Sequence, residues 1–247
     1  MAGEQFDKRW YILGGFLVLA VVIVGIILIS RGGGSSKNES STTASKEKEA
    51  KKESTKEGKE EKTAASCKKV ETPKAKAEGS LKKPKQAVKK GEKLTAVVET
   101  NCGTFDIELA TSEAPITTNS FAYLAEEGFY NELIFHRIVP GFVIQGGDPT
   151  QTGAGGPGYS VTEAPPKNLE YTKGVVAMAK SSTDPAGASG SQFFVVTGEN
   201  AGLPAEYAYV GNVSKGMKVV ETIGELGNAE EKPTQTVEIE KMSIERG

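Results

Sequence analysis

The chain of 247 residues carries 30 Lys and Arg against 32 Asp and Glu, with one His and two Cys. A single histidine excludes metal sites and catalytic pairs built from several histidines, and two well-separated cysteines form no metal-binding pattern. The formal net charge of −2 averages over zones of different composition, the first of which is a short polar tail at residues 1–9.

Residues 10–30 form an apolar run, WYILGGFLVLAVVIVGIILIS. A helix of about 20 apolar residues matches the roughly 30 Å hydrocarbon core of a bilayer. A cleaved signal peptide is the alternative, but its apolar region is shorter, and Arg31-Gly-Gly-Gly follows this run in place of a small-residue cleavage site. The run therefore predicts a single-pass transmembrane anchor, with residues 1–9 inside the cell and the rest outside the cytoplasm.

Residues 31–93 hold 19 basic and 10 acidic residues and few aromatic or β-branched ones. Such a segment buries too little apolar surface to offset its ordering entropy, so we expect a disordered linker. Residues 94–247 are predicted to form the globular domain, with 9 basic and 20 acidic residues. An acidic domain is a poor nucleic-acid binder, so no nucleic-acid partner is expected.

The two cysteines lie in different zones, Cys67 in the linker and Cys102 in a predicted hairpin turn. Outside the cytoplasm they can pair with each other. Free thiols and an intermolecular disulfide are the alternatives, and the sequence leaves all three open.

Within the domain, alternating or β-rich segments predict eight strands, at residues 94–100, 104–109, 133–138, 142–145, 174–180, 191–197, 208–213 and 236–245. Helical spacing predicts two helices, at residues 116–127 after Pro115 and at residues 216–226, with Met217, Val220 and Ile223 on one face. Residues 148–173 are rich in Gly and Pro and are expected to form a long loop. The count favours an all-β fold, a closed eight-stranded antiparallel barrel capped by two short helices.

The stretch ELIFHRIVPGFVIQGGDP, residues 132–149, places a permanent cation and an amide in an apolar hairpin. In a regular strand Phe135 and Arg137 share one face and His136 faces the other way, so His136 is expected to pack or hydrogen-bond and not to catalyse. The interior of an eight-stranded barrel is filled by side chains, so a ligand site must lie outside it. Arg137 and Gln145, with nearby phenylalanines, can hydrogen-bond a peptide backbone and hold a small apolar ring.

Two blocks, FHRIVPGFVIQGGDPTQTGAGGPGY and GVVAMAKSSTDPAGASGSQFFVVT, resemble the signature blocks of the cyclophilin family of peptidyl-prolyl isomerases. The resemblance runs from about Leu94 to the C-terminus and implies the family's eight-stranded barrel with two helices. Together with the apolar run, it favours a membrane-anchored, bacterial-like form of the family.

The resemblance also implies the site. The catalytic residues of the family match Arg137, Phe142 and Gln145. The residues that hold the peptide match a larger set, which is Val143, Ala179, Lys180, Gln192, Phe194, Leu203 and Tyr207. No metal and no cofactor are expected.

Three positions depart from the usual family residues. Lys180 replaces a usual Asn, which changes the charge along a strand edge that pairs with the substrate backbone. Gly202 stands where many members have Trp, which argues against tight binding of the cyclic peptide cyclosporin. Tyr207 falls where many members have His and removes a second titratable group.

The predicted function is acceleration of rotation about X-Pro bonds in peptides and folding proteins, by non-covalent stabilisation of the twisted amide. The expected partners are proline-containing peptides, unfolded or exported proteins, and the membrane, with the catalytic domain on the extracytoplasmic side of the cell membrane. One alternative is a non-catalytic, membrane-tethered module that binds proline-containing segments. A second is an adaptor whose Lys-rich linker is the functional binder.

Overall fold

The structure is a computed structural model that describes residues 66–247. Eight strands of this part of the chain form a closed antiparallel barrel. In order around the barrel they are β1 (Leu94–Thr100), β10 (Glu238–Arg246), β3 (Leu133–Val139), β4 (Val143–Gly146), β8 (Phe193–Val196), β6 (Val175–Met178), β9 (Tyr209–Lys215) and β2 (Gly103–Leu109). The predicted eight-stranded antiparallel barrel is confirmed.

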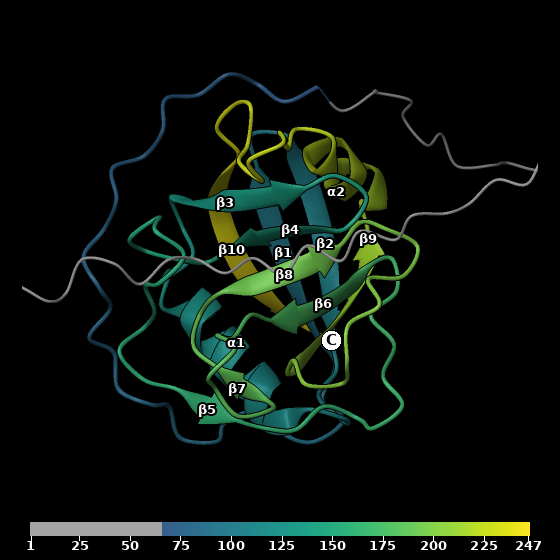
Figure 1. Ribbon diagram of the computed structural model, residues 1–247. Helices are drawn as coiled ribbons and strands as arrows, with labels where there is room; N and C mark the ends of the chain where they lie inside the picture. Colours follow the sequence, from purple (N-terminus) through teal and green to yellow (C-terminus); the bar gives the residue numbers. More distant parts are fainter. Residues whose placement is uncertain (1–65) are drawn as a thin grey trace, which may run out of the picture. The chain divides into compact units, whose positions relative to one another are not determined.

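Two short helices cover the ends of the barrel (Figure 1). The first, α1 (Pro115–Glu126), starts with proline at its N-terminus, where the missing N–H costs nothing, and packs against β9 and β10. The second, α2 (Met217–Gly224), packs against β2, β3 and β4 and buries Val220 and Ile223. Both predicted helices are confirmed, with ends that differ by one or two residues.

The barrel interior is filled by alternate residues of its strands. In β1, Leu94, Ala96 and Val98 are buried in the interior while the residues between them are partly exposed. This alternation is typical of an antiparallel strand with one face in the core. Strands β4, β6 and β8 depart from it, because apolar residues are buried on both of their faces. Their outer faces form a second apolar cluster outside the barrel.

The segment expected as one long loop contains a short strand. β5 (Val161–Thr162) pairs with β7 (Ala188–Ser189) in a separate two-stranded sheet. The prediction of a loop over residues 148–173 is wrong at this point. Two-residue strands show no periodicity in sequence, so only the tertiary pairing reveals them.

Residues 66–93, here called the strap, were expected to be part of the disordered linker, yet the structure places them against the barrel. The strap runs around the outside of the barrel before it enters β1 (Figure 1). Its N-terminal end is fastened by a Cys67–Cys102 disulfide, so of the three alternatives the structure shows an intramolecular bond. Further along, Ala87 and Val88 donate their N–H groups to Asn119 Oδ1 at 2.7 and 2.9 Å. These bonds, together with the burial of Val88 in the core, hold a strap whose composition is otherwise poor in apolar residues.

The predicted tail (residues 1–9), the transmembrane anchor (10–30) and the first half of the linker (31–65) lie outside the described residues. Among residues 66–247, no helix combines the length and the apolar character that crossing a bilayer requires.

Candidate active site

The β3–β4 hairpin carries the cation, and a β-bulge decides where it points. Phe135 pairs with Gly146 and Arg137 with Gln145, so two steps along β3 match one step along β4. Phe135 and Ile138 are both in the barrel interior, whereas Arg137 lies outside it, one-third exposed. The expectation that Phe135 and Arg137 share a face is therefore wrong. A bulge breaks the alternation, and bulges often re-aim a side chain near a functional site.

Arg137 lies at a hollow of about 210 Å³ on the outside of the barrel. The lining consists of nine of the ten residues named from sequence, which are Arg137, Phe142, Val143, Gln145, Ala179, Lys180, Phe194, Leu203 and Tyr207. We call this the small hollow. The tenth residue, Gln192, lines the adjoining larger hollow. The structure thus brings all ten residues to one region, although they come from three strands and four connecting segments.

The guanidinium of Arg137 is held from two sides. Its Nε donates to Glu231 Oε2 at 2.7 Å, and Nη1 donates to Gln145 Oε1 at 3.4 Å. Its central carbon lies 6.0 Å from the centroid of the Phe142 ring, within reach of a cation–π attraction. Sequence reasoning missed Glu231, because it is 94 positions away in a loop without a motif.

The apolar wall of the small hollow rests on a buried tyrosine that the sequence analysis also missed. The Tyr171 hydroxyl donates to the Tyr207 carbonyl at 2.6 Å and accepts from the Tyr207 N–H at 3.0 Å. Burial raises the pKa of Tyr171 to about 12, although its bond to Tyr207 acts in the opposite direction. Tyr207 and Phe194 meet edge to face with ring centroids 5.6 Å apart. Tyr171 therefore fixes the backbone that presents the Tyr207 ring.

The departures from the family pattern have visible consequences. The Lys180 side chain is only 6% exposed, and its Nζ donates to the carbonyls of Ser181 and Asp184 at 3.3 and 3.2 Å. It also lies 5.5 Å from the centroid of the Tyr207 ring. At Gly202 (φ +64°) an added Cβ would meet no atom within 4 Å, so the space beside the small hollow is open there. The ammonium group of Lys180 is thus bound by carbonyls of its own loop and lies 3.7 Å from the Glu206 carboxylate, in the loop between β8 and β9.

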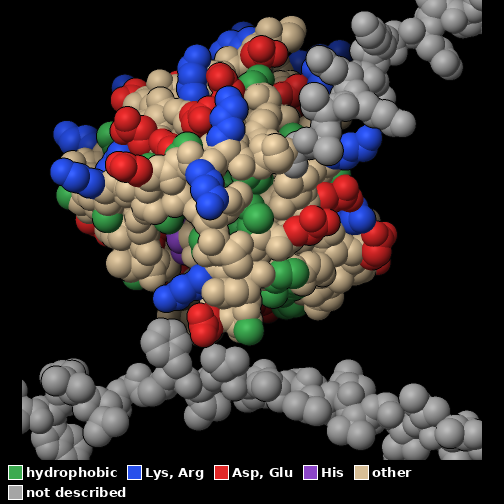
Figure 2. All heavy atoms as spheres, turned by 90° about the horizontal axis from the view of Figure 1, so that it is seen from above, with side chains coloured by type: hydrophobic (Ala, Val, Ile, Leu, Met, Phe, Trp, Pro, Cys, Tyr) green, Lys and Arg blue, Asp and Glu red, His purple; other side chains and the backbone are tan. Residues whose placement is uncertain are grey.

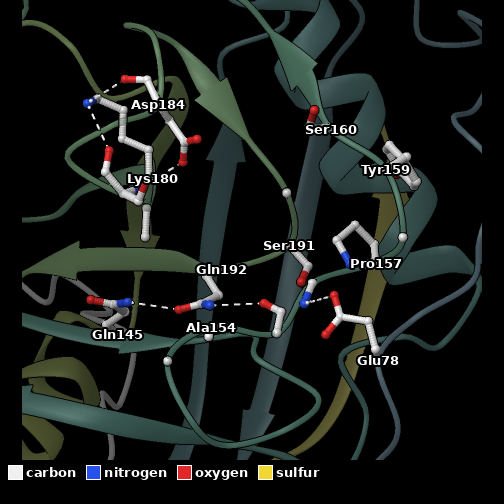
Figure 3. A pocket seen from close by; sticks show the side chains of 17 residues that line it. Glu78, Gln145, Ala154, Pro157, Tyr159, Ser160, Lys180, Asp184, Ser191 and Gln192 are labelled. Carbon is white, nitrogen blue, oxygen red and sulfur yellow. Dashed lines mark hydrogen bonds between the residues drawn. The ribbon is translucent and has the colours of Figure 1, made fainter. Parts of the chain in front are cut away.

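The larger hollow, of about 730 Å³, shares Gln145, Ala179 and Lys180 with the small one. A chain of hydrogen bonds crosses it (Figure 3): Gln145 Nε2 donates to Gln192 Oε1 at 3.0 Å, and Gln192 Nε2 donates to the Gly155 carbonyl at 2.9 Å. On the far side the Gly156 N–H donates to Glu78 Oε1 at 3.0 Å. The strap therefore contributes one wall of this hollow.

His136 lies next to Arg137 but has a different environment. Its two ring nitrogens are buried and have no hydrogen-bond partner among the described residues. Burial lowers the pKa of His136, with Arg137 acting in the same direction and Asp148 against it. With both ring nitrogens buried and without a partner in the described part of the chain, His136 fits the packing alternative of its predicted role and not the hydrogen-bonding one.

On the face of the molecule seen in Figure 2, basic and acidic side chains are interspersed and form no broad basic surface of the kind that contacts nucleic acid. Within residues 66–247, no three His, Cys, Asp or Glu side chains gather as a metal site would require.

Comparisons with known proteins show the family of the barrel domain. The profile of the family described as "Cyclophilin type peptidyl-prolyl cis-trans isomerase/CLD" matches residues 95–244. A "Peptidyl-prolyl cis-trans isomerase-like 1" of Aspergillus oryzae is 39% identical over 146 residues, which is 57% of this chain and 89% of the relative. The mouse protein of the same name is 38% identical over 149 residues, or 58% of this chain and 88% of the relative.

A solved structure is similar as well. A cyclophilin-type peptidyl-prolyl cis-trans isomerase of Cryptosporidium parvum, crystallised in the presence of the dipeptide Ala-Pro, superposes with a TM-score of 0.57 at 32% identity. The match covers 62% of this chain and 99% of that one. This chain belongs to the family of cyclophilin-type peptidyl-prolyl cis-trans isomerases.

Proposed function

We propose that this protein catalyses cis–trans isomerisation of X-Pro bonds in peptide segments that bind across the two hollows. The observation that carries the proposal is the guanidinium of Arg137, held by Glu231 and Gln145 beside a hollow of about 210 Å³ with an apolar wall. The apolar wall can hold a proline ring, and the cation beside it can act on the bond that precedes that ring.

The reaction needs no covalent intermediate. Rotation about the amide has a barrier of about 18–20 kcal/mol because amide resonance must be broken. In the twisted state the proline nitrogen becomes pyramidal and regains its lone pair. A preorganised donor aimed at that nitrogen binds the twisted state better than either planar isomer and so lowers the barrier. Arginine suits this task because it stays protonated and its donors are fixed in a plane.

The other groups keep the rest of the peptide still. Phe142, Val143, Phe194 and Leu203 enclose the ring on the small-hollow side. Gln145 and Gln192, linked by a 3.0 Å hydrogen bond, offer amide groups to the peptide backbone. The segment Ala179–Lys180, which borders both hollows, lies beside the residues that precede the proline. With ring and backbone held, only the X-Pro amide turns.

The test is turnover of a proline-containing peptide by the full-length chain, followed by exchange NMR between the cis and trans signals. Arg137→Ala should lower kcat/KM by about 10²–10³, as for one lost donor to a developing charge, with the melting temperature retained. Arg137→Lys is the matched control, since it keeps the charge but not the planar set of donors, and should remain well below the wild type. If the wild type binds the peptide but does not exchange it, the protein is the non-catalytic binding module and the proposal fails.

We also propose that the protein is a membrane-anchored, bacterial-like member of the family and that it acts on unfolded or exported proteins outside the cytoplasm. The apolar run at residues 10–30 supports the anchor. The Cys67–Cys102 disulfide supports an oxidising compartment, because such bonds persist outside the cytoplasm. Protease accessibility of residues 66–247 in intact cells tests the orientation, and protection of the domain would reverse it.

A further inference from the structure

Glu231 is the acidic partner of Arg137, and its backbone is unusual. It lies in the loop between α2 and β10, with φ at +62°, in the left-handed region that side-chain-bearing residues avoid. Its Oε2 accepts from Arg137 Nε at 2.7 Å. The Glu231 side chain is half exposed, so an energetically costly backbone conformation supports a carboxylate that is not part of the core.

The loop holds Glu231 in this conformation by hydrogen bonds. Asn228 organises the turn: its carbonyl accepts from the Glu231 N–H at 3.0 Å, and its Oδ1 accepts from the N–H groups of Glu230 and Lys232 at 3.0 and 2.9 Å. The Glu231 carbonyl in turn accepts from the Ile138 N–H at 2.9 Å. Glu231 is therefore docked by its backbone on β3, one residue beyond Arg137, and its side chain reaches back to the guanidinium.

We infer that Glu231 is a positioning residue for Arg137, an inference that rests on the proposed function. By accepting from Nε, the carboxylate fixes the plane of the guanidinium and leaves its terminal nitrogens for Gln145 and for the proline nitrogen of a bound peptide. An arginine side chain has several rotatable bonds, and fixing it before the peptide binds removes an ordering cost from the twisted state. The ion pair is partly exposed, so it contributes orientation and little stability.

A purely structural role predicts a different residue at this position. Glycine would form the same backbone bonds to Asn228 and Ile138 without the cost of the left-handed conformation. Glu132 supplies the comparison within the chain. It has φ at +59° and is also exposed, but its carboxylate lies 3.6 Å from Lys76 of the strap and it lines neither hollow. Of these two glutamates with the same backbone conformation, one contacts the guanidinium and one does not.

The experiment uses the full-length chain with three substitutions, Glu231→Gly, Glu231→Gln and the matched control Glu132→Gly. We expect Glu231→Gly to lower kcat about five- to tenfold with little change in KM, while the melting temperature stays the same or rises. Glu231→Gln keeps a hydrogen-bond acceptor and should recover kcat to within about twofold of the wild type. Glu132→Gly should leave turnover unchanged.

Three outcomes overturn the inference. Wild-type kcat in Glu231→Gly does so directly. A drop in melting temperature that exceeds that of Glu132→Gly and accounts for the lost activity points to a structural role alone. A measurement without turnover separates this inference from the proposed function: the exchange rate of the Arg137 Nε–H, by NMR. Slow exchange in the wild type and faster exchange in Glu231→Gly support positioning even if no peptide is turned over, and equal rates in both proteins refute it.

Discussion

In β4, β6 and β8, alternate residues build two apolar clusters, the barrel interior and the outer cluster, and the two clusters have different roles. In β8, Phe193 and Val195 face the barrel interior while Phe194 and Val196 belong to the outer cluster. In β4, Ile144 faces inward and Val143 outward. The interior is surrounded by strands on every side and closed at its ends by α1 and α2. The outer cluster is covered by loop residues such as Tyr171 and Leu203, which leave the small hollow open.

This difference teaches how a solid barrel carries a binding site. A strand that is apolar at every position is buried on both faces, and the face outside the barrel needs its own covering layer. Where that layer is incomplete, an apolar hollow remains beside the polar groups that the neighbouring strands present. The following substitutions test whether one cluster sustains the fold and the other sustains the chemistry.

The largest expected effect is in the interior. Phe193 is fully buried and makes edge-to-face contacts with Phe121, Tyr130 and Phe135. Phe193→Ala should lower the free energy of unfolding by about 3–5 kcal/mol through lost burial and the remaining cavity. Urea denaturation measures this loss. Folded Phe193→Ala protein should retain most of its turnover per molecule, and a selective loss of activity would break the division between the clusters.

The disulfide extends the interior into the strap, since Cys102 belongs to the inner cluster and Cys67 packs against it. Cys67→Ala should cost about 2–4 kcal/mol of unfolding free energy, because the unfolded chain is no longer constrained by the bond between residues 35 apart in sequence. Reduction of the wild type should reproduce the loss, and the variant should not respond to a reducing agent. Equal stability of the oxidised and reduced wild type would contradict the prediction.

In the outer cluster, Phe142→Ala should act mainly on binding. The ring forms one wall of the small hollow, so its loss should weaken peptide binding by about 1–2 kcal/mol, or about five- to thirtyfold in KM. The loss of stability should be well below that of Phe193→Ala, because Phe142 is only partly buried. Peptide titration and urea denaturation of the same preparation measure both quantities. A stability loss that equals that of Phe193→Ala would remove the contrast.

The smallest expected effect is a pH dependence of stability that arises from His136. Burial lowers the pKa of His136 in the folded state, so the unfolded chain takes up this proton first as the pH falls below about 6.5. Stability should therefore decrease on acidification from about pH 6.5 and stay constant with respect to this group above that value. Thermal unfolding at pH 7.5 and 5.5 measures the decrease, and His136→Gln should lack this part of it.

Turnover should vary little between about pH 6 and 9, because the proposed mechanism transfers no proton. A bell-shaped profile of kcat/KM would point to a titrating group that contacts the peptide and would contradict the mechanism. Asp148 adds a pH dependence of stability only at lower pH. Burial opposes ionisation of its carboxyl group, but hydrogen bonds from Thr150 and the Gly153 N–H outweigh this and lower its pKa.

The sequence by itself determined the barrel. Alternation in segments such as LTAVVET, helical spacing at Val220 and Ile223, and proline at the start of α1 are local signals whose physical cause is the geometry of one strand or one helix. The resemblance to a family pointed to the ten candidate site residues, all of which border the two hollows. These features could be read because each depends on residues that are near one another in the chain.

Only the tertiary structure decided the rest. The bulge that turns Arg137 outward depends on how β3 pairs with β4, and no residue of the stretch FHRIV predicts it. Glu231 and Tyr171 reach the site from loops distant in sequence, and the strap is held by hydrogen bonds, one disulfide and the burial of single residues such as Val88, without a periodic apolar pattern. Interactions of this kind join residues far apart in the chain through one contact each. They produce no periodic pattern in the sequence, so they can be recognised only in the folded structure.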